Sequence, residues 1–280
     1  MLNSQEIYGA TVPDLFNLMR DLPDYEDVAH PTHNHFGQIR IKAWRMALDT
    51  FAFGFVSHNE RWGADHTAHK KGRTTRGGYV IEKSKSLAPK LTPGLEAILG
   101  DAGVSYASVL AGMLSSELAE PLIETAIDLL IKRNEDPAIG EELFHSSQDR
   151  PSSVPDLLVA AYAGEFARHM QVSEEEAGEM IRETEAGYQQ SMILYGEMLA
   201  REETEAIKEL AVQGAVLVNT FLQSASWGEI SLSADLLEEF IGLAISEVEG
   251  DYQQEIAETL SYLQHRSTLS QWLHRILKRN

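Results

Sequence analysis

The chain has 280 residues, and its 43 acidic and 23 basic side chains give a formal net charge of −20. Such a surface argues against a nucleic-acid backbone as a binding partner. The chain has no cysteine, which excludes disulfides, thiolate zinc sites and thiol nucleophiles, so any metal must bind to nitrogen and oxygen ligands. The sequence has no signal-peptide pattern and no apolar run of membrane-spanning length, which predicts a cytoplasmic protein without a membrane span.

The N-terminal segment predicts a short helix that is interrupted at Pro13 and Asp14. The next segment, residues 21–37, is rich in proline and aspartate and has no sustained periodicity, so it is predicted to be a loop. The histidines of this loop are His30, His33 and His35. A loop that brings imidazoles to a ligand-bearing helix is typical of discontinuous metal sites.

The most informative stretch is residues 54–69, GFVSHNERWGADHTAH. Apolar residues at helical spacing lead into it, which predicts one helix through the whole stretch. At about 100° per residue, His58, Asp65 and His69 lie within about 20° of one stripe. Burying a carboxylate with several imidazoles is costly unless a metal or a hydrogen-bond network compensates, so the stripe predicts a metal site. The alternative is a group of solvated residues at a helix end.

Residues 70–94 are basic and rich in glycine, which predicts a long exposed loop. Its Lys70, Lys71 and Arg73 are candidates for binding the phosphate group of an anionic substrate, and plain solvation is the alternative. Residues 79–81 form the best candidate for a β-strand, although the segment is short and isolated.

A long helix is predicted over residues 104–133, in which Pro121 either causes a kink or marks a new first turn. Within it, Glu117, Glu124 and Asp128 repeat the spacing of His58, Asp65 and His69. Glu124 and Asp128 have apolar neighbours and are predicted as further metal ligands, whereas Glu117 fits a solvated helix edge.

The remaining sequence predicts helices joined by short turns, with no convincing strand and no internal repeat. The predicted helices begin at residue 136 and then cover residues 153–169, 173–201, 203–223, 233–248, 250–265 and 267–278. We therefore expect an all-α fold with a metal-binding helical core in residues 1–150. A C-terminal helical part, residues 151–280, is expected to pack on this core as one continuous domain.

Four motifs in order resemble the zinc-dependent phospholipase C family, which is related to the fungal single-strand nucleases. They are GATVPDLF, PDYED with THNHF, FGFVSHNERWGADHTAH and PLIETAID, and they fall in roughly the first 135 residues. The resemblance implies a multi-helix bundle with two or three zinc ions, held by histidines and carboxylates, that hydrolyses phosphate esters.

By this resemblance, Asp14 matches the aspartate of the family's G-A-x-x-P-D motif, and His33 or His35 matches the loop histidine that follows. The two histidines of the family's helix match His58 and His69. The family's aspartate on that helix is replaced by Trp62. Asp65 lies about one turn further along and is expected to take its place.

The chain departs from the family's pattern at the last motif as well. The family's pair of a histidine and a carboxylate aligns with Glu120 and Glu124, or with Glu124 and Asp128, so its histidine is missing. The N-terminal tryptophan and histidine that bind a third ion in the secreted phospholipases have no counterpart. One or two ions are therefore expected, with zinc favoured and manganese, magnesium, iron or calcium as alternatives.

The activity implied is that of a phospholipase C-like phosphodiesterase, in which a metal-activated water attacks a small phosphate ester or a phospholipid head group. Asp14 or Asp65 would orient that water. The alternative is a catalytically inactive helical binding or assembly module that retains a structural metal. A di-iron carboxylate bundle is disfavoured, because it requires Glu-x-x-His on paired helices and the chain has this spacing once, at Glu142 and His145. The sequence gives no indication of the oligomeric state.

Overall fold

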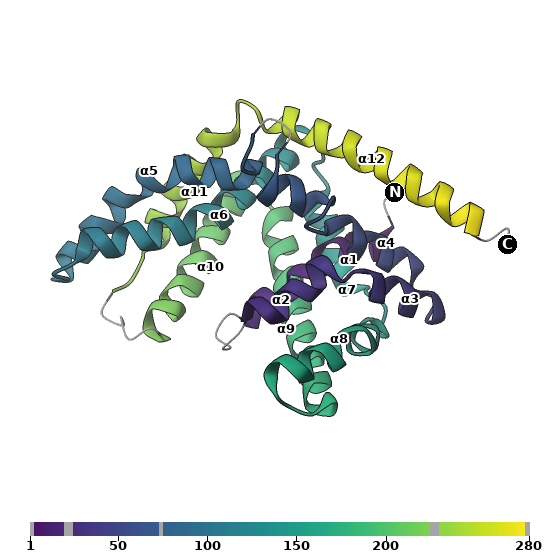
Figure 1. Cartoon of the computed structure of the whole chain (residues 1–280). Coiled ribbons are helices and arrows are strands. Elements are labelled where there is room, and N and C mark those ends of the chain that lie inside the picture. The colour runs from purple at the N-terminus through teal and green to yellow at the C-terminus, as the bar shows by residue number, and fades with distance from the viewer. Residues whose placement is uncertain (1–2, 20–24, 73–74, 225–229, 278–280) are drawn as a thin grey trace. The chain divides into compact units, whose positions relative to one another are not determined.

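The computed structural model describes residues 3–19, 25–72, 75–224 and 230–277, with side chains over 3–15, 30–72, 75–223 and 230–264 (Figure 1). All regular structure in these ranges is helical and none of it is strand, which confirms the predicted all-α fold. None of the described helices combines the length and apolar character needed to cross a membrane.

The chain divides into two compact units, and both are built from separate stretches of sequence. The first comprises residues 1–70, 141–196 and 259–280, and the second comprises residues 71–140 and 197–258. Each unit therefore contains residues from both sides of the predicted boundary at residue 150.

The first unit contains all the histidines described in the N-terminal third of the chain. Its helices are α1 (Ser4–Thr11), the 3-10 helix η1 (Val12–Met19), α2 (Tyr25–Asn34), α3 (Gly37–Arg45), α4 (Asp49–His58), the π-helical segment η2 (His66–Lys70), α7 (Ile139–Gln148), α8 (Val154–Met170), α9 (Glu174–Ala200) and α12 (Tyr252–Leu277), of which α7, α9 and α12 extend into the second unit.

A row of aromatic side chains forms the core of the first unit. Tyr8 of α1, Phe51 and Phe55 of α4, and Tyr162 and Phe166 of α8 are all fully buried. Successive ring centroids in this row are between 6.2 and 6.4 Å apart. Aromatic pairs at such separations add to the free energy gained by burying the rings, so the row holds α1, α4 and α8 together.

Helices α1 and α4 approach each other backbone to backbone. A Cβ atom on Gly9 would lie 2.2 Å from the carbonyl oxygen of Phe51, and one on Gly54 would lie 2.0 Å from the carbonyl oxygen of Glu6. Only glycine fits at such a crossing. The close approach brings the end of α4 beside the end of α1, where the candidate site begins.

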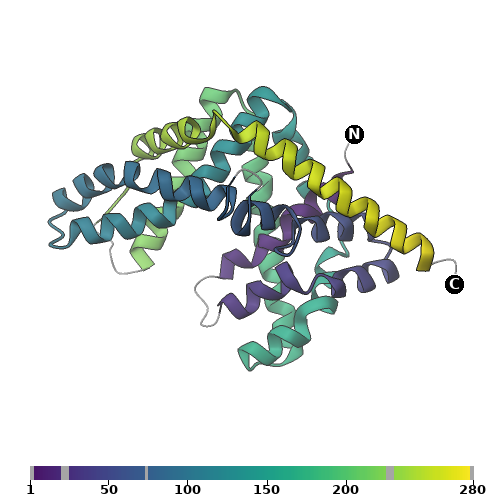
Figure 2. The same ribbon diagram turned by 45° about the horizontal axis from the view of Figure 1, so that its top comes forward.

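The second unit is built around α5 (Tyr79–Asp101), α6 (Ala107–Asn134), α10 (Glu203–Ser224) and α11 (Ala234–Val248). Helices α5 and α6 lie side by side in both views (Figures 1 and 2). The turn between them uses Gly103 at φ +73°, and the amide of Val104 donates to the carbonyl of Leu99. A left-handed glycine is a common helix C-terminal signal.

Several predicted helices are confirmed, with ends that differ by a few residues. They are α6, α8, α9, α10 and α11. Two of these helices have serine N-terminal caps, since Ser173 Oγ accepts from the amide of Glu176 at 3.1 Å and Ser233 Oγ accepts from the amide of Leu236 at 3.2 Å. Pro121 lies inside α6 without ending it.

Outside residues 54–69, three predictions of secondary structure are wrong. The segment 21–37 is not a loop, because α2 occupies residues 25–34. Residues 79–94 are not a loop but the first turns of α5, which includes the short strand candidate at residues 79–81 and buries Leu87, Leu91 and Leu95 at helical spacing. The two helices predicted after residue 250 are one helix, α12.

Candidate metal centre

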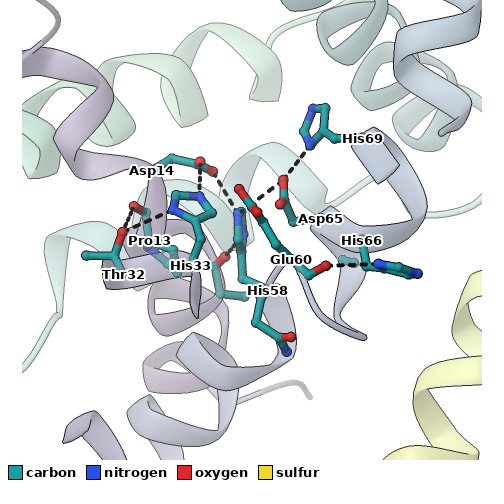
Figure 3. Close-up of polar contacts among 12 residues, drawn as sticks. Pro13, Asp14, Thr32, His33, His58, Glu60, Asp65, His66 and His69 are labelled. Carbon is teal, nitrogen blue, oxygen red and sulfur yellow. Dashed lines mark hydrogen bonds and ion pairs between the residues drawn. The ribbon is translucent and has the colours of Figure 1, made fainter. Parts of the chain in front are cut away.

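Three elements of the first unit meet at Asp14, His33 and His58. Asp14 lies on η1 directly after α1, His33 lies in the last turn of α2, and His58 is the last residue of α4. Figure 3 shows the Asp14 carboxylate with a contact to each of the two imidazoles. Segments that are well separated in the sequence therefore deliver one carboxylate and two imidazoles to a single point.

Two distances in this group are close to those between neighbouring ligands of one metal ion. His33 Nε2 is 3.3 Å from Asp14 Oδ1, and His58 Nε2 is 3.4 Å from Asp14 Oδ2. One donor atom from each of the three residues lies within 4.8 Å of the others. Two donors bound to one zinc ion at about 2.0 to 2.1 Å are about 3.3 to 3.4 Å apart. The group therefore offers nitrogen and oxygen donors of the types that zinc binds, at two separations close to this value.

The hydrogen bond made by His58 Nδ1 determines which nitrogen of this ring carries the proton. Nδ1 lies 2.9 Å from the carbonyl oxygen of Ala10, which can only accept, so Nδ1 carries the proton. In the neutral ring, Nε2 then has a lone pair, makes no hydrogen bond and faces Asp14 at 3.4 Å and Asp65 at 3.9 Å. A lone pair held against two carboxylates requires a cation or a proton between them.

Asp65 and His69 extend the group. Asp65 is buried, with 7% of its side chain exposed, and its Oδ1 is 3.9 Å from His58 Nε2. The same oxygen also accepts a short hydrogen bond from His69 Nδ1. Two carboxylates and three imidazoles thus form one continuous polar cluster inside the first unit (Figure 3).

The predicted single helix through residues 54–69 is wrong, although His58 and Asp65 are close. Helix α4 ends at His58, and the side chain of buried Asn59 accepts from the amides of Arg61 and Trp62 at 2.9 and 3.0 Å. A Cβ atom on Gly63 would lie 2.4 Å from the carbonyl oxygen of Ser57, so glycine permits the tight turn. This turn, and not a helical stripe, returns Asp65 to His58.

The charges in the cluster shift the pKa values of its members in opposite directions. Burial alone raises the pKa of Asp14, but His58 and His33 outweigh burial and hold the pKa well below the usual range. Burial alone lowers the pKa of His58, but Asp14 and then Asp65 raise it to about 9. The pKa of Asp65 is lowered by the hydrogen bond from His69 and by the neighbouring histidines, against the effect of burial.

Of the two alternatives for the loop histidine, His33 is the one that faces Asp14. His35 Nδ1 lies 2.9 Å from Glu165 Oε1 on α8 instead. The third histidine, His30, is exposed and lies edge-on to His35, with ring centroids 5.5 Å apart.

The predicted substrate-binding residues are exposed or lie outside the described residues. Lys70 Nζ is 3.5 Å from Glu60 Oε2, and Lys71 is exposed. Arg73 lies outside the described residues. Glu124 and Asp128 are on α6 in the second unit, so their role as ligands stays a prediction.

Sequence reasoning missed Thr32 and Ala10, which contact the imidazole nitrogens on the side away from Asp14. Thr32 Oγ1 lies 3.1 Å from His33 Nδ1, and the Ala10 carbonyl accepts from His58. The position of Thr32 directly before His33 was the one available signal. The partner of His58 is a backbone atom, which residue identity cannot reveal.

The chain matches no family model, no curated protein and no solved structure.

Proposed function

We propose that this protein is a metal-dependent hydrolase of phosphate esters, a phosphodiesterase of the phospholipase C type that the motifs resemble. The observation that supports it is that one possible ligand atom from each of Asp14, His33 and His58 lies within 4.8 Å of the other two, all in the first unit. These residues come from the first three of the four motifs. The donor set of imidazole and carboxylate favours zinc, with manganese, magnesium, iron or calcium as alternatives.

The need for a cation follows from the chain's own charges. His58 Nε2 faces two carboxylates, and one of them, Asp65, is buried. In the metal-free protein a proton on His58 meets this need, in keeping with its raised pKa. A divalent ion would also compensate the carboxylates at neutral pH. It carries two positive charges where the proton carries one, and it coordinates both nitrogen and oxygen atoms.

When bound, such an ion lowers the pKa of a coordinated water to about 7 in favourable cases and so supplies hydroxide at neutral pH. Asp14 holds His33 and His58 in position, and 39% of its side chain is exposed, so its carboxylate can also orient a water that enters from solvent. Buried Asp65 orients His69 through their hydrogen bond. The hydrogen bond to the Ala10 carbonyl keeps His58 Nδ1 protonated. It also keeps His58 Nε2 directed at Asp14 and Asp65.

The substrate we propose is small and carries a single phosphate group, as in a phosphate ester or a phospholipid head group. The net charge of −20 repels long polyanions, and nucleic acid is excluded from the proposal on this ground. Lys70 and Lys71 are exposed near the end of η2, where they can attract an anion. We also propose that the protein is cytoplasmic.

A second candidate is a helical binding module in which the metal is structural. The observation that favours it is that the cluster joins η1, α2 and α4, so an ion there would stabilise the first unit without any reaction. Lys70 is also paired with Glu60, which lowers its availability for a substrate.

Metal analysis and a phosphodiesterase assay separate the two candidates. The purified protein is stripped with a chelator, reloaded with zinc, and assayed with bis(p-nitrophenyl) phosphate. We expect bound zinc and turnover in the wild type, and loss of both in His58→Gln and Asp14→Asn. His145→Gln is the control, because His145 is an exposed residue of α7. Bound zinc without turnover favours the structural module. If neither zinc nor any of the alternative metals binds, both candidates are overturned.

A further inference from the structure

We infer that Thr32 is a positioning residue that lets His33 change its tautomer when a metal binds. The inference rests on the proposed metal centre. It concerns a buried hydroxyl that touches neither metal nor substrate and acts only through His33.

The hydroxyl of Thr32 lies between a nitrogen and a carbonyl oxygen. Only 1% of Thr32 is exposed, and its Oγ1 is 3.1 Å from His33 Nδ1 and 3.1 Å from the carbonyl oxygen of Pro13. The carbonyl can only accept a hydrogen bond, whereas the imidazole nitrogen can donate or accept according to the tautomer. A hydroxyl has one hydrogen and can also accept, so it can serve both tautomers of His33.

Each tautomer suits one state of the centre. With the proton of His33 on Nε2, the ring donates to Asp14 Oδ1 at 3.3 Å, and the Thr32 hydroxyl donates to Nδ1. This arrangement suits the metal-free protein, because a proton lies between Nε2 and the carboxylate. With the proton on Nδ1, the ring donates to Thr32 Oγ1, the hydroxyl donates to Pro13, and the Nε2 lone pair is available to a metal.

The change leaves the charge of His33 as it was. Nε2 loses one proton to solvent, Nδ1 takes up one, and the hydroxyl hydrogen of Thr32 turns from Nδ1 towards the Pro13 oxygen. No heavy atom has to move. His58 differs, because its Nδ1 faces the Ala10 carbonyl, which accepts only, so its Nδ1 stays protonated in both states.

Long-range proton–nitrogen NMR of protein labelled with 15N-histidine tests the inference, before and after zinc is added. In the wild type and in Thr32→Ser we expect the proton of His33 to move from Nε2 to Nδ1, while His58 keeps its Nδ1 proton as an internal reference. Thr32→Val lacks the hydroxyl, so it should bind zinc about 10- to 100-fold more weakly, the range found when a hydrogen-bond partner of a metal-bound histidine is removed.

Thr184→Val is the matched control. Its hydroxyl donates at 2.7 Å to the carbonyl of Met180 within α9 of the same unit, so its removal should leave zinc affinity unchanged. Zinc binding in the wild type without a tautomer change overturns the role of Thr32 but leaves the proposed function standing. No zinc binding in the wild type overturns both. If Thr32→Val fails to fold, the spectra of the wild type and Thr32→Ser still decide.

Discussion

His58 donates from Nδ1 to the carbonyl oxygen of Ala10 at 2.9 Å, and this bond joins the end of α4 to the end of α1. The two residues are 48 positions apart in the sequence. The bond exists because Gly9 and Gly54 let the two helix backbones touch. The geometry of the candidate centre therefore depends on the packing of two glycines that carry no chemistry themselves.

Replacing Gly54 by alanine should disturb this crossing. The new Cβ would lie 2.0 Å from the carbonyl oxygen of Glu6, which is backbone and cannot turn away. Overpacking of this kind destabilises by about 1 to 3 kcal/mol and sometimes more. We expect a lower free energy of unfolding in urea together with weaker zinc binding, because α4 must move away from Ala10.

Gly242→Ala is the control for this substitution. Gly242 lies within α11, and a Cβ there would meet nothing within 4 Å. Alanine in a helix interior is favoured over glycine by about 0.5 to 1 kcal/mol, so this variant should be slightly more stable. Equal stability of the two variants would contradict the proposed backbone contact between α1 and α4.

The stability of the metal-free protein should fall as the pH rises from about 6.5 to about 9. The pKa of His58 is raised from 6.5 to about 9 by Asp14 and Asp65, against the effect of burial. Protonated His58 therefore stabilises the fold, fully below the unfolded pKa and no longer above the folded one. Urea unfolding at a series of pH values measures this, and His58→Gln should flatten the curve in this range. A wild-type curve that is already flat there would contradict the raised pKa.

The stability contributed by the same cluster should also fall at acidic pH, through Asp14. The pKa of Asp14 is lowered from its usual value of 3.8, so the stability contributed by its carboxylate is present above that value and is lost as the pH falls below it. Asp14→Asn should remove this acid-dependent loss. Asp156→Asn is the control, because Asp156 is 63% exposed at the surface and pairs with Arg182.

Arg150→Met should destabilise the first unit strongly. Arg150 Nε is 2.7 Å from Glu185 Oε1, and the Glu185 side chain is fully buried, with a hydrogen bond of 2.8 Å from the Tyr8 hydroxyl. Removing one partner of a buried ion pair costs about 3 to 5 kcal/mol, because the other charge is left in the core. Burial raises the pKa of Glu185, so the loss should become smaller as acid protonates the carboxyl.

Arg182→Met is the matched comparison for Arg150. Arg182 pairs with Asp156 at 3.3 Å and with Glu179 at 2.8 Å, but these side chains are 40% to 64% exposed. Exposed ion pairs contribute about 0 to 1 kcal/mol. Urea unfolding should therefore separate the two variants clearly, and similar losses would contradict the buried pair at Glu185.

The fold class and most helices were predictable from the sequence because apolar residues recur at helical spacing. The early part of α5 was missed because Pro89, Pro93 and several glycines suggested a loop. The burial of Leu87, Leu91 and Leu95 against the rest of the second unit outweighs those local signals. Tertiary packing of this kind is not visible in a local window of sequence.

The site was predictable in its residue types but not in its geometry. His58 and Asp65 were expected to be close because of a helical stripe, and they are close because the turn at Asn59 reverses the chain. The choice between His33 and His35 was open, since both lie in one short segment. It depends on how α2 meets η1, where Thr32 bonds to Pro13.

Zinc should slow amide hydrogen exchange in the first unit and leave the second unit almost unchanged. An ion held by Asp14, His33 and His58 joins η1, α2 and α4, so local opening of any of them would have to release it. At a free zinc concentration of 100 times the dissociation constant, the bound state gains about 2.7 kcal/mol. Exchange measured by mass spectrometry should therefore show added protection in peptides from η1, α2 and α4, with peptides from α11 as the internal control. Protection spread evenly over both units, or confined to the second, would show that the ion binds elsewhere.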